Sequence, residues 1–347
     1  MSVNRRLPPS ISPVHGSICE AGAIDTERAV RGSRSALGER ASIVLARVYL
    51  GLQAIAGAAW WIAVFSSDDV RRWTLGGLSA AAFVVPDVVL LVGASAAAAI
   101  LGSRGLAAVT AGWTMLVTIG LIVYATAERQ AGWGATAMVL GAIGSVGAAL
   151  TMWLGRLPTQ WIVVGPFAFR AARERARSRH LLHSLAQLVL FWTTFLILLP
   201  LLLGWIERRW RIEWPAFAGD PLVLAGVIVF MGGSCFGIWS CLSMALIGHG
   251  TPLPSAMANR LVVVGPYRIV RNPMAVAGAL QTIGVGLWTG SWVVLAAAVA
   301  GGVLWNQLIR PEEEADLAAR FGADYERYRS TVRCWLPRLR GIPPASV

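Results

Sequence analysis

Long apolar runs follow one another along the chain and are separated by short polar turns. Most are about 20 residues long, enough to cross the roughly 30 Å hydrocarbon core of a bilayer as a helix. No run alternates with the two-residue period of a membrane barrel, and a spanning helix satisfies its own backbone hydrogen bonds. The pattern therefore predicts an all-α integral membrane protein with about eight transmembrane helices. The predicted spans are 43–65, 75–101, 106–127, 133–154, 182–206, 221–247, 273–288 and 291–309.

The composition supports a membrane protein. Of the 347 residues, 56% are hydrophobic and only 14% are charged, whereas a soluble domain has about 25% charged residues. An ordinary soluble globular protein is thereby excluded.

The charged residues predict the orientation. All 30 basic residues are arginine, and the net charge is +12. If eight spans alternate from a cytoplasmic N-terminus, six arginines lie outside, matched there by six acids, and 24 lie inside. Because cytoplasmic loops are enriched in basic residues, both termini are predicted to be cytoplasmic. The arginines flank membrane segments without a nucleic-acid-binding module, so the predicted partners are membrane lipids and not nucleic acid.

Changes in composition divide the chain into parts. The N-terminal segment is rich in Ser, Gly, Pro and charge and has no apolar h-region, which predicts disorder and not a signal peptide. A basic stretch with six arginines separates the first four spans from the last four. The predicted parts are a disordered cytoplasmic tail (1–42), a four-helix membrane module of unknown role (43–154), a basic cytoplasmic linker (155–181), a second membrane domain (182–340) and a short tail (341–347).

The residues after the last span are too polar to cross a membrane. A first amphipathic helix is predicted over 311–321, with Gly322 as its C-terminal cap. In a second helix, Tyr325, Tyr328 and Val332 repeat at spacings of three and four residues and form one apolar face. This face leaves Arg320, Arg327, Arg329 and Arg333 for solvent or lipid headgroups. The predicted C-terminal half is thus a helical hairpin followed by short amphipathic cytoplasmic helices.

A polar stretch, GPYRIVRNPMAVAG, precedes the seventh run. Asn272 is a preferred N-cap and Pro273 a favoured first helical residue, so a helix begins here at the membrane surface. Its free N–H groups and dipole, together with Arg268 and Arg271, predict a site for a carboxylate or phosphate. A simple helix cap beside lipid-bound arginines is the alternative.

Arg310 and the glutamates that follow the last span form a second group. The hairpin of the last two spans returns Arg310, Glu313 and Glu314 to the membrane face that carries Arg271. Groups that bind anions and cations would then face one another, which suits a ligand with both a carboxylate and an ammonium group. The alternative is ordinary pairing of acids with the dipole of a helix N-terminus.

An acid, Asp87, lies inside the second apolar run, directly after Pro86. Placing a carboxyl group within a membrane span costs a few kcal/mol of free energy, so an acid at such a position is a candidate functional residue. Two interpretations are therefore kept, a functional polar site and a polar contact that packs the helices.

Three motifs, GHGTPLP (residues 248–254), LVVVGPYRIVRNPM (261–274) and EEADLAARFGADYERYRSTVRCWLPR (313–338), occur in an order that resembles the isoprenylcysteine carboxyl methyltransferase family. That family is related to the membrane phospholipid N-methyltransferases. The resemblance covers about residues 185–340 and makes 182–340 a methyltransferase-like domain. It implies transfer of a methyl group from S-adenosylmethionine, bound at the cytoplasmic face between the hairpin and the C-terminal helices.

The resemblance also implies roles for individual residues. Arg271, Asn272 and Pro273 match the R-[HN]-P core of the family pattern, and Glu313 with Glu314 matches its paired acids. The implied catalytic residues are Arg271, Asn272 and Glu313, and no metal site is implied. The implied cofactor-binding residues are Tyr267, Arg268, Arg271, Asn272, Pro273, Gly278, Arg310, Glu313, Glu314 and Tyr328.

Two positions depart from the family pattern. Asn272 stands where many members have His, so an imidazole base is not required. Ala275 stands where the family usually has Tyr, which removes a ring from the expected pocket.

The predicted function is that of a membrane-embedded S-adenosylmethionine-dependent methyltransferase acting on a small or lipidic acceptor: a carboxylate, thiol or amine. The alternatives are a nicotinamide-dependent membrane reductase of related helical arrangement and a non-catalytic membrane or transport component with a decayed site. The absence of lysine favours a GC-rich bacterial genome and hence the bacterial inner membrane. These patterns leave the acceptor and the oligomeric state undefined.

Overall fold

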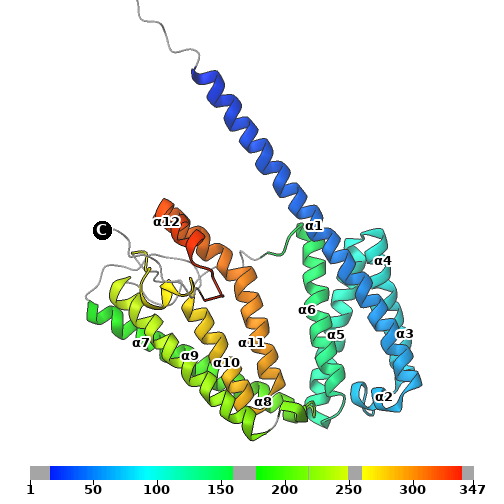
Figure 1. Cartoon of the computed structure of the whole chain (residues 1–347). Coiled ribbons are helices and arrows are strands. Elements are labelled where there is room, and N and C mark those ends of the chain that lie inside the picture. The colour runs from blue at the N-terminus through cyan, green and yellow to red at the C-terminus, as the bar shows by residue number, and fades with distance from the viewer. Residues whose placement is uncertain (1–15, 159–176, 218, 249–259, 338–347) are drawn as a thin grey trace, which may run out of the picture. The chain divides into compact units, whose positions relative to one another are not determined.

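The structure is a computed structural model and describes residues 16–158, 177–217, 219–248 and 260–337. These residues form helices joined by turns, and no strand occurs among them (Figure 1). The all-α prediction is therefore confirmed. The α-helices are α1 (Gly16–Ser66), α2 (Asp68–Thr74), α3 (Ala80–Asp87), α4 (Ala94–Leu101), α5 (Arg104–Glu128), α6 (Gly132–Leu154), α7 (Arg177–Trp192), α8 (Leu199–Arg209), α9 (Asp220–Ile247), α10 (Pro273–Thr289), α11 (Trp292–Leu304) and α12 (Arg310–Thr331).

Short helices of other types complete the described elements. Three π-helical segments interrupt longer helices, and each continues the helix before it. These are η1 (Val88–Gly93), η4 (Thr193–Leu198) and η8 (Trp305–Ile309), and the 3₁₀ turns are η5 (Pro215–Phe217) and η7 (Gly265–Arg268).

Seven helical segments among the described residues are long and apolar enough to cross a membrane. The predicted span 273–288 corresponds to α10, which has 17 residues and is shorter than the others. The last segment runs from Trp292 to Thr331, and its charged part begins at Arg310, where α12 starts. The seven segments are Gly38–Ser66, Ala80–Leu101, Arg104–Glu128, Gly132–Leu154, Ala186–Arg209, Asp220–Ile247 and Trp292–Thr331.

The first helix begins earlier than its apolar run. α1 starts at Gly16, inside the segment for which composition predicts disorder, and its apolar part starts at Gly38. Between them the chain is rich in Ala, Arg and Glu, which have high helix propensity.

The described residues divide into two compact units. Unit 1 contains α1, α3, η1, α4, α5 up to Val117 and α6 from Val139. Unit 2 contains α2, the remaining parts of α5 and α6, and every element from α7 onward. The polar groups of the candidate site all lie in unit 2.

Unit 1 contains the intramembrane acid. The carboxylate of Asp87 accepts hydrogen bonds from the indole N–H of Trp61, at 2.7 Å, and of Trp113, at 2.8 Å. These two residues lie on α1 and α5, and Asp87 and Trp61 are buried. The structure thus shows the polar packing contact that was one of the two interpretations of Asp87.

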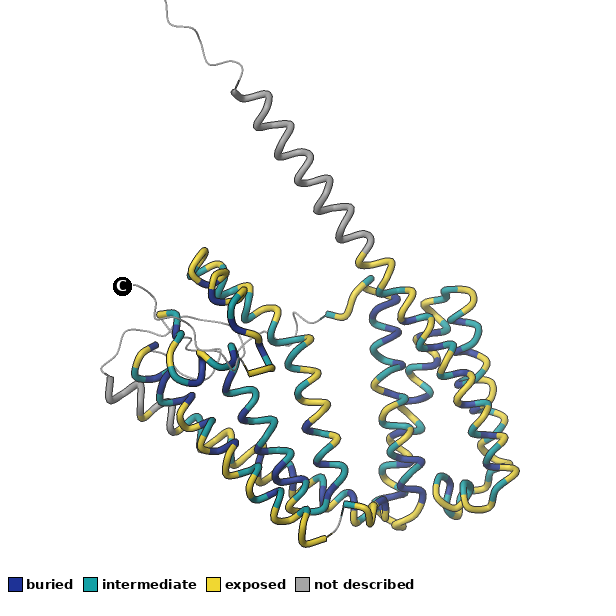
Figure 2. Tube along the Cα trace, viewed as in Figure 1, coloured by how far each residue is buried: buried dark blue, intermediate teal, exposed yellow. Residues whose placement is uncertain are grey.

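In unit 2, α9 and α10 pack side by side through glycines (Figure 1). A Cβ atom on Gly226 would lie 2.5 Å from the backbone nitrogen of Trp288, and one on Gly284 would lie 2.6 Å from that of Phe230. The helix backbones therefore approach closely only because these positions lack side chains. Exposed apolar residues, among them Leu224 and Ile228, lie along another face of α9, as expected in lipid (Figure 2).

The predicted hairpin is formed by α10 and α11. Gly290 adopts a left-handed conformation, with φ 65°, at the end of α10. Ser291 then caps α11 by accepting a hydrogen bond from the N–H of Val294. Because the turn is this short, α11 leads the chain back toward the start of α10.

The C-terminal amphipathic helices are also present. Gly322, with φ 51° and ψ −126°, breaks α12 into two parts at the predicted position. Beyond it, Tyr325, Tyr328 and Val332 are buried together, which confirms the predicted apolar face.

Candidate functional site

The start of α10 positions the first group of polar residues. The side-chain oxygen of Asn272 accepts from the N–H of Ala275 at 3.0 Å, and Pro273 is buried in the first turn. The predicted helix entry is thus confirmed. Upstream, Gly265 has φ +57°, and a Cβ there would lie 2.9 Å from the hydroxyl of Ser243. A glycine is needed for η7 to pack against α9 and place Tyr267 and Arg271.

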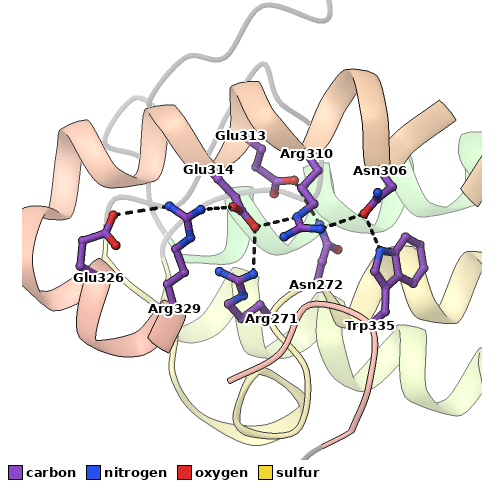
Figure 3. Close-up of polar contacts among 9 residues, drawn as sticks. All are labelled: Arg271, Asn272, Asn306, Arg310, Glu313, Glu314, Glu326, Arg329 and Trp335. Atoms are coloured by element: carbon purple, nitrogen blue, oxygen red, sulfur yellow. Dashed lines mark hydrogen bonds and ion pairs between the residues drawn. The ribbon is translucent and has the colours of Figure 1, made fainter. Parts of the chain in front are cut away.

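Asn272 also contacts α12. Its side-chain amide donates to the carboxylate of Glu313 at 3.1 Å, while its oxygen caps α10 (Figure 3). Among the described residues no arginine forms an ion pair with Glu313, which distinguishes this carboxyl group from that of Glu314.

The neighbouring acid, Glu314, is surrounded by arginines (Figure 3). It lies 3.0 Å from Arg271, 2.8 Å from Arg310 and 3.5 Å from Arg329. The hairpin therefore brings the two predicted groups into direct contact. Arg329 also pairs with Glu326 at 3.7 Å, so the three guanidinium groups share the carboxylates of Glu314 and Glu326.

Arg271 has two hydrogen-bond donors that the described residues of this cluster do not bind. Its side chain is 10% exposed and binds Glu314 through Nη2 only. The Nε and Nη1 atoms are buried and have no hydrogen-bond partner among the described residues. Buried polar atoms without a partner are rare in native proteins, and guanidinium donors prefer carboxylates and phosphates. The arrangement is therefore able to bind an anionic group at Arg271.

Two tyrosines link η7 to α12. The hydroxyl of Tyr328 donates to the backbone oxygen of Tyr267 at 2.7 Å. The Tyr267 ring is buried against Val262, Met244 and Met274. Burial raises the pKa of the Tyr267 phenol well above its ordinary value, and the charges of Tyr328 and Glu313 act in the same direction. The phenol is therefore neutral at physiological pH.

Asn306 and Arg329 belong to the network but not to the site predicted from the sequence. Asn306 accepts from Arg310 at 2.9 Å and from the indole of Trp335 at 3.0 Å. Its signal was a polar residue in an apolar run, four positions before Arg310. Arg329, which the amphipathic pattern assigns to solvent or headgroups, instead reaches Glu314.

Two other predicted residues lie elsewhere on η7 and α10. Arg268 is exposed on η7, and Gly278 lies farther along α10, where a Cβ would face Phe191 at 3.7 Å. Of the motif GHGTPLP only Gly248 belongs to the described residues, so its histidine lies outside them.

Comparison with known families concerns this same part of the chain. Residues 222–324 match the family model described as phospholipid methyltransferase. The match runs from the first turn of α9 into α12 and includes Arg271, Asn272 and Glu313. Comparison with curated proteins and with solved structures gives no match. The family match confirms the membrane methyltransferase resemblance that the sequence motifs predict, and it places this resemblance in residues 222–324.

Proposed function

We propose that the protein is a membrane-embedded S-adenosylmethionine-dependent methyltransferase whose site is formed by η7, α10 and α12. The observation that carries this proposal is that two buried donors of Arg271 have no partner among the described residues, within the segment that matches the phospholipid methyltransferase model. When bound, S-adenosylmethionine supplies a methyl group activated by its sulfonium centre.

Arg271 is proposed to hold the carboxylate of the cofactor. Its charge is offset only in part, because Glu314 is shared with Arg310 and Arg329. The N–H groups at the start of α10 add a positive dipole end close by. Because Glu314 already forms ion pairs with these arginines, it is not available to bind the ammonium group of a ligand.

Glu313 is proposed to hold the ammonium group of the cofactor. It has no arginine partner among the described residues, and Asn272 fixes one of its oxygens at 3.1 Å. The carboxylate and ammonium of one ligand would therefore bind two adjacent places, with Asn272 between Arg271 and Glu313. No histidine among the residues that the structure describes takes part in this arrangement.

The role left to the protein is mainly positional. Methyl transfer requires the nucleophile, the methyl carbon and the leaving sulfur to lie in line. Holding the reactants in this geometry removes a large part of the activation barrier. A carboxylate or thiolate acceptor needs no base, whereas a protonated amine must first lose a proton. A small or lipidic acceptor, reached from the bilayer, is our proposal.

The orientation of the site is proposed from charge. The excess of arginine places both termini and α12 at the cytoplasmic face by the positive-inside rule. With the lysine-free composition, this suggests the inner membrane of a bacterium.

The proposal is tested by thermal unfolding of the protein in detergent with and without cofactor. A ligand at 100 times its Kd should stabilise the folded state by about 2.7 kcal/mol. S-adenosylmethionine should do so in the wild type, and not in Arg271→Gln or Glu313→Gln. Arg327→Gln and Glu312→Gln are matched controls, because both side chains are exposed and lie outside the network.

Other outcomes separate the alternatives. Stabilisation by NADPH alone would overturn the proposal in favour of a reductase. No response to either cofactor would favour a non-catalytic membrane component. If S-adenosylmethionine stabilises the protein, the protein should also transfer a labelled methyl group from this cofactor to components of a lipid extract. Labelling only of water-soluble thiols would contradict a lipidic acceptor.

A further inference from the structure

Residues 333–337, the covering segment, follow α12 and contact both ends of the α10–α11 hairpin. The backbone oxygen of Arg333 accepts a hydrogen bond from the N–H of Arg271, just before α10, at 2.9 Å. The indole N–H of Trp335 donates to the side-chain oxygen of Asn306, in η8, at 3.0 Å. The covering segment therefore lies against the candidate site and is attached to it at two places.

The attachment at Asn306 belongs to the same network as the arginines (Figure 3). One oxygen of Asn306 accepts from both Trp335 and Arg310, and Arg310 in turn binds Glu314 at 2.8 Å. Glu314 binds Arg271 at 3.0 Å. Because the covering segment also meets the backbone of Arg271, it closes a ring of contacts that includes the candidate anion site.

Two donors of Arg271 are shut off from solvent in this ring. Its Nε and Nη1 atoms are buried and have no hydrogen-bond partner among the described residues. A ligand carboxylate does not reach atoms that solvent does not reach, so the site stands in a closed arrangement. An element that covers Arg271 must therefore move before a ligand binds there.

The covering segment is the element with the fewest contacts to break. α12 is held to η7 and α10 by an ion pair at Glu314, by hydrogen bonds at Glu313 and Tyr328, and by a buried apolar face. Within the described residues, two hydrogen bonds and an edge-to-face contact of Trp335 with Trp305 join the covering segment to elements other than α12. Ligand-binding segments are drawn from the less stable parts of a fold.

We propose that the hydrogen bond between Trp335 and Asn306 is a latch that holds the covering segment over the site. The segment opens to admit and release the ligand that Arg271 binds, and it closes when the latch re-forms. This role rests on the proposed function and regulates the same site. Trp335 and Asn306 are positioning residues, which act through the covering segment and not by contact with the ligand.

The thiol of Cys334 reports on opening without any ligand. Cys334 lies in the covering segment and is 8% exposed, so an alkylating reagent reaches it when the segment opens. In a protein whose other cysteines are alanine, Trp335→Phe should raise the alkylation rate in detergent about fivefold, the size of one hydrogen bond. In denaturant the rates should be equal. In an Asn306→Ala background Trp335→Phe should have no further effect, because the latch is already absent.

Trp153→Phe is the matched control. The indole of Trp153, on α6, donates to the backbone oxygen of Arg104 at 3.2 Å, so this variant also loses one indole hydrogen bond, in unit 1. It should leave the alkylation rate of Cys334 unchanged. Equal acceleration in both variants would overturn the latch, since alkylation would then follow general unfolding.

The second measurement is the exchange of radiolabelled S-adenosylhomocysteine, followed by rapid filtration. Because the segment must open for both entry and exit, Trp335→Phe should raise the association and dissociation rate constants by the same factor, about fivefold, and leave Kd unchanged. A residue that contacts the ligand would change Kd instead.

These outcomes separate the latch from the proposed function. If S-adenosylhomocysteine does not bind the wild type, the proposed function fails, and the latch fails with it because it has no ligand to admit. If the wild type binds it, a wild-type rate for Trp335→Phe in either measurement overturns only the latch. A raised Kd with an unchanged association rate would also overturn the latch, because Trp335 would then contact the ligand.

Discussion

The guanidinium group of Arg271 lies 3.0 Å from the carboxylate of Glu314, and both side chains are nearly buried, at 10% and 14% exposure. Arg271 precedes α10 and Glu314 belongs to α12, so this ion pair joins the two ends of the α10–α11 hairpin. Because Glu314 binds only one nitrogen of Arg271, the pair orients the guanidinium group, and the other two nitrogens have no partner in the part of the chain that the structure describes. One contact thus supports both the fold and the candidate anion site.

Glu314→Gln should be strongly destabilising. The change leaves Arg271, Arg310 and Arg329 close together without their shared counter-charge, and removing one partner of a buried pair costs about 3–5 kcal/mol. The measurement is the midpoint of thermal unfolding in detergent without ligand.

Asp324→Asn serves as its control. Asp324 pairs with Arg327 at 3.7 Å, and both side chains are largely exposed. An exposed pair contributes about 0–1 kcal/mol, so this variant should behave as the wild type. Equal effects of the two substitutions would show that Glu314 is not the centre of the cluster.

Gly284→Ala should separate α9 from α10. The added Cβ would lie 2.6 Å from the backbone nitrogen of Phe230, and a rigid backbone cannot move aside without shifting a helix. Overpacking of this kind costs about 1–3 kcal/mol. Methyl transfer should fall as well, because α10 carries Asn272 at its start.

Gly232→Ala provides the comparison on the same helix pair. No atom lies within 4 Å of a Cβ at Gly232 on α9, so unfolding and activity should be unchanged. A similar loss in both variants would point to a general sensitivity of α9 and α10 to side chains and not to their close approach.

Asp87→Asn should lower the folding stability of unit 1. The two indole N–H groups now meet separate oxygens of the carboxylate, and the NH2 group of an asparagine would replace one of these oxygens and leave one indole without its acceptor. An unsatisfied buried donor costs about 1–3 kcal/mol. A double-mutant cycle with Trp61→Phe should show coupling, since the two residues share a hydrogen bond. Full stability with lost activity would instead assign Asp87 to function.

The sequence predicts those parts of the site that local rules determine. Asn272 and Pro273 form a cap and a first turn, which depend on neighbouring residues only. The hairpin follows from two apolar runs and a very short turn, and Gly322 marks the break in α12. Local rules therefore predict that Arg271 and the glutamates share one face.

The specific pairings depend on three-dimensional packing. Arg329 reaches Glu314 only because α12 bends at Gly322, and the helical pattern alone assigns it to solvent. Glu313 and Glu314 are adjacent in sequence, yet one meets Asn272 and the other meets arginines. No periodicity distinguishes them, since the distinction arises from how α12 lies across the start of α10.

The thiol of Cys334 should report on the packing of the C-terminal segment. Burial raises its pKa, while Arg310 and Arg271 act in the opposite direction. Because the thiolate is the reactive form, alkylation should be slow in the folded protein and faster in denaturant at the same pH. The rate is measured by mass spectrometry on a variant whose other cysteines, Cys19, Cys235 and Cys241, are replaced by alanine.

The same shift predicts how stability depends on pH. A pKa that is higher in the folded than in the unfolded chain means that the folded state holds the proton more tightly. Its contribution to stability is complete below the ordinary thiol pKa of about 8.5 and is lost as the pH rises through the folded value. Cys334→Ala should therefore lose less stability than the wild type between neutral and alkaline pH. Parallel losses in both proteins, together with equal alkylation rates in buffer and denaturant, would contradict a buried Cys334.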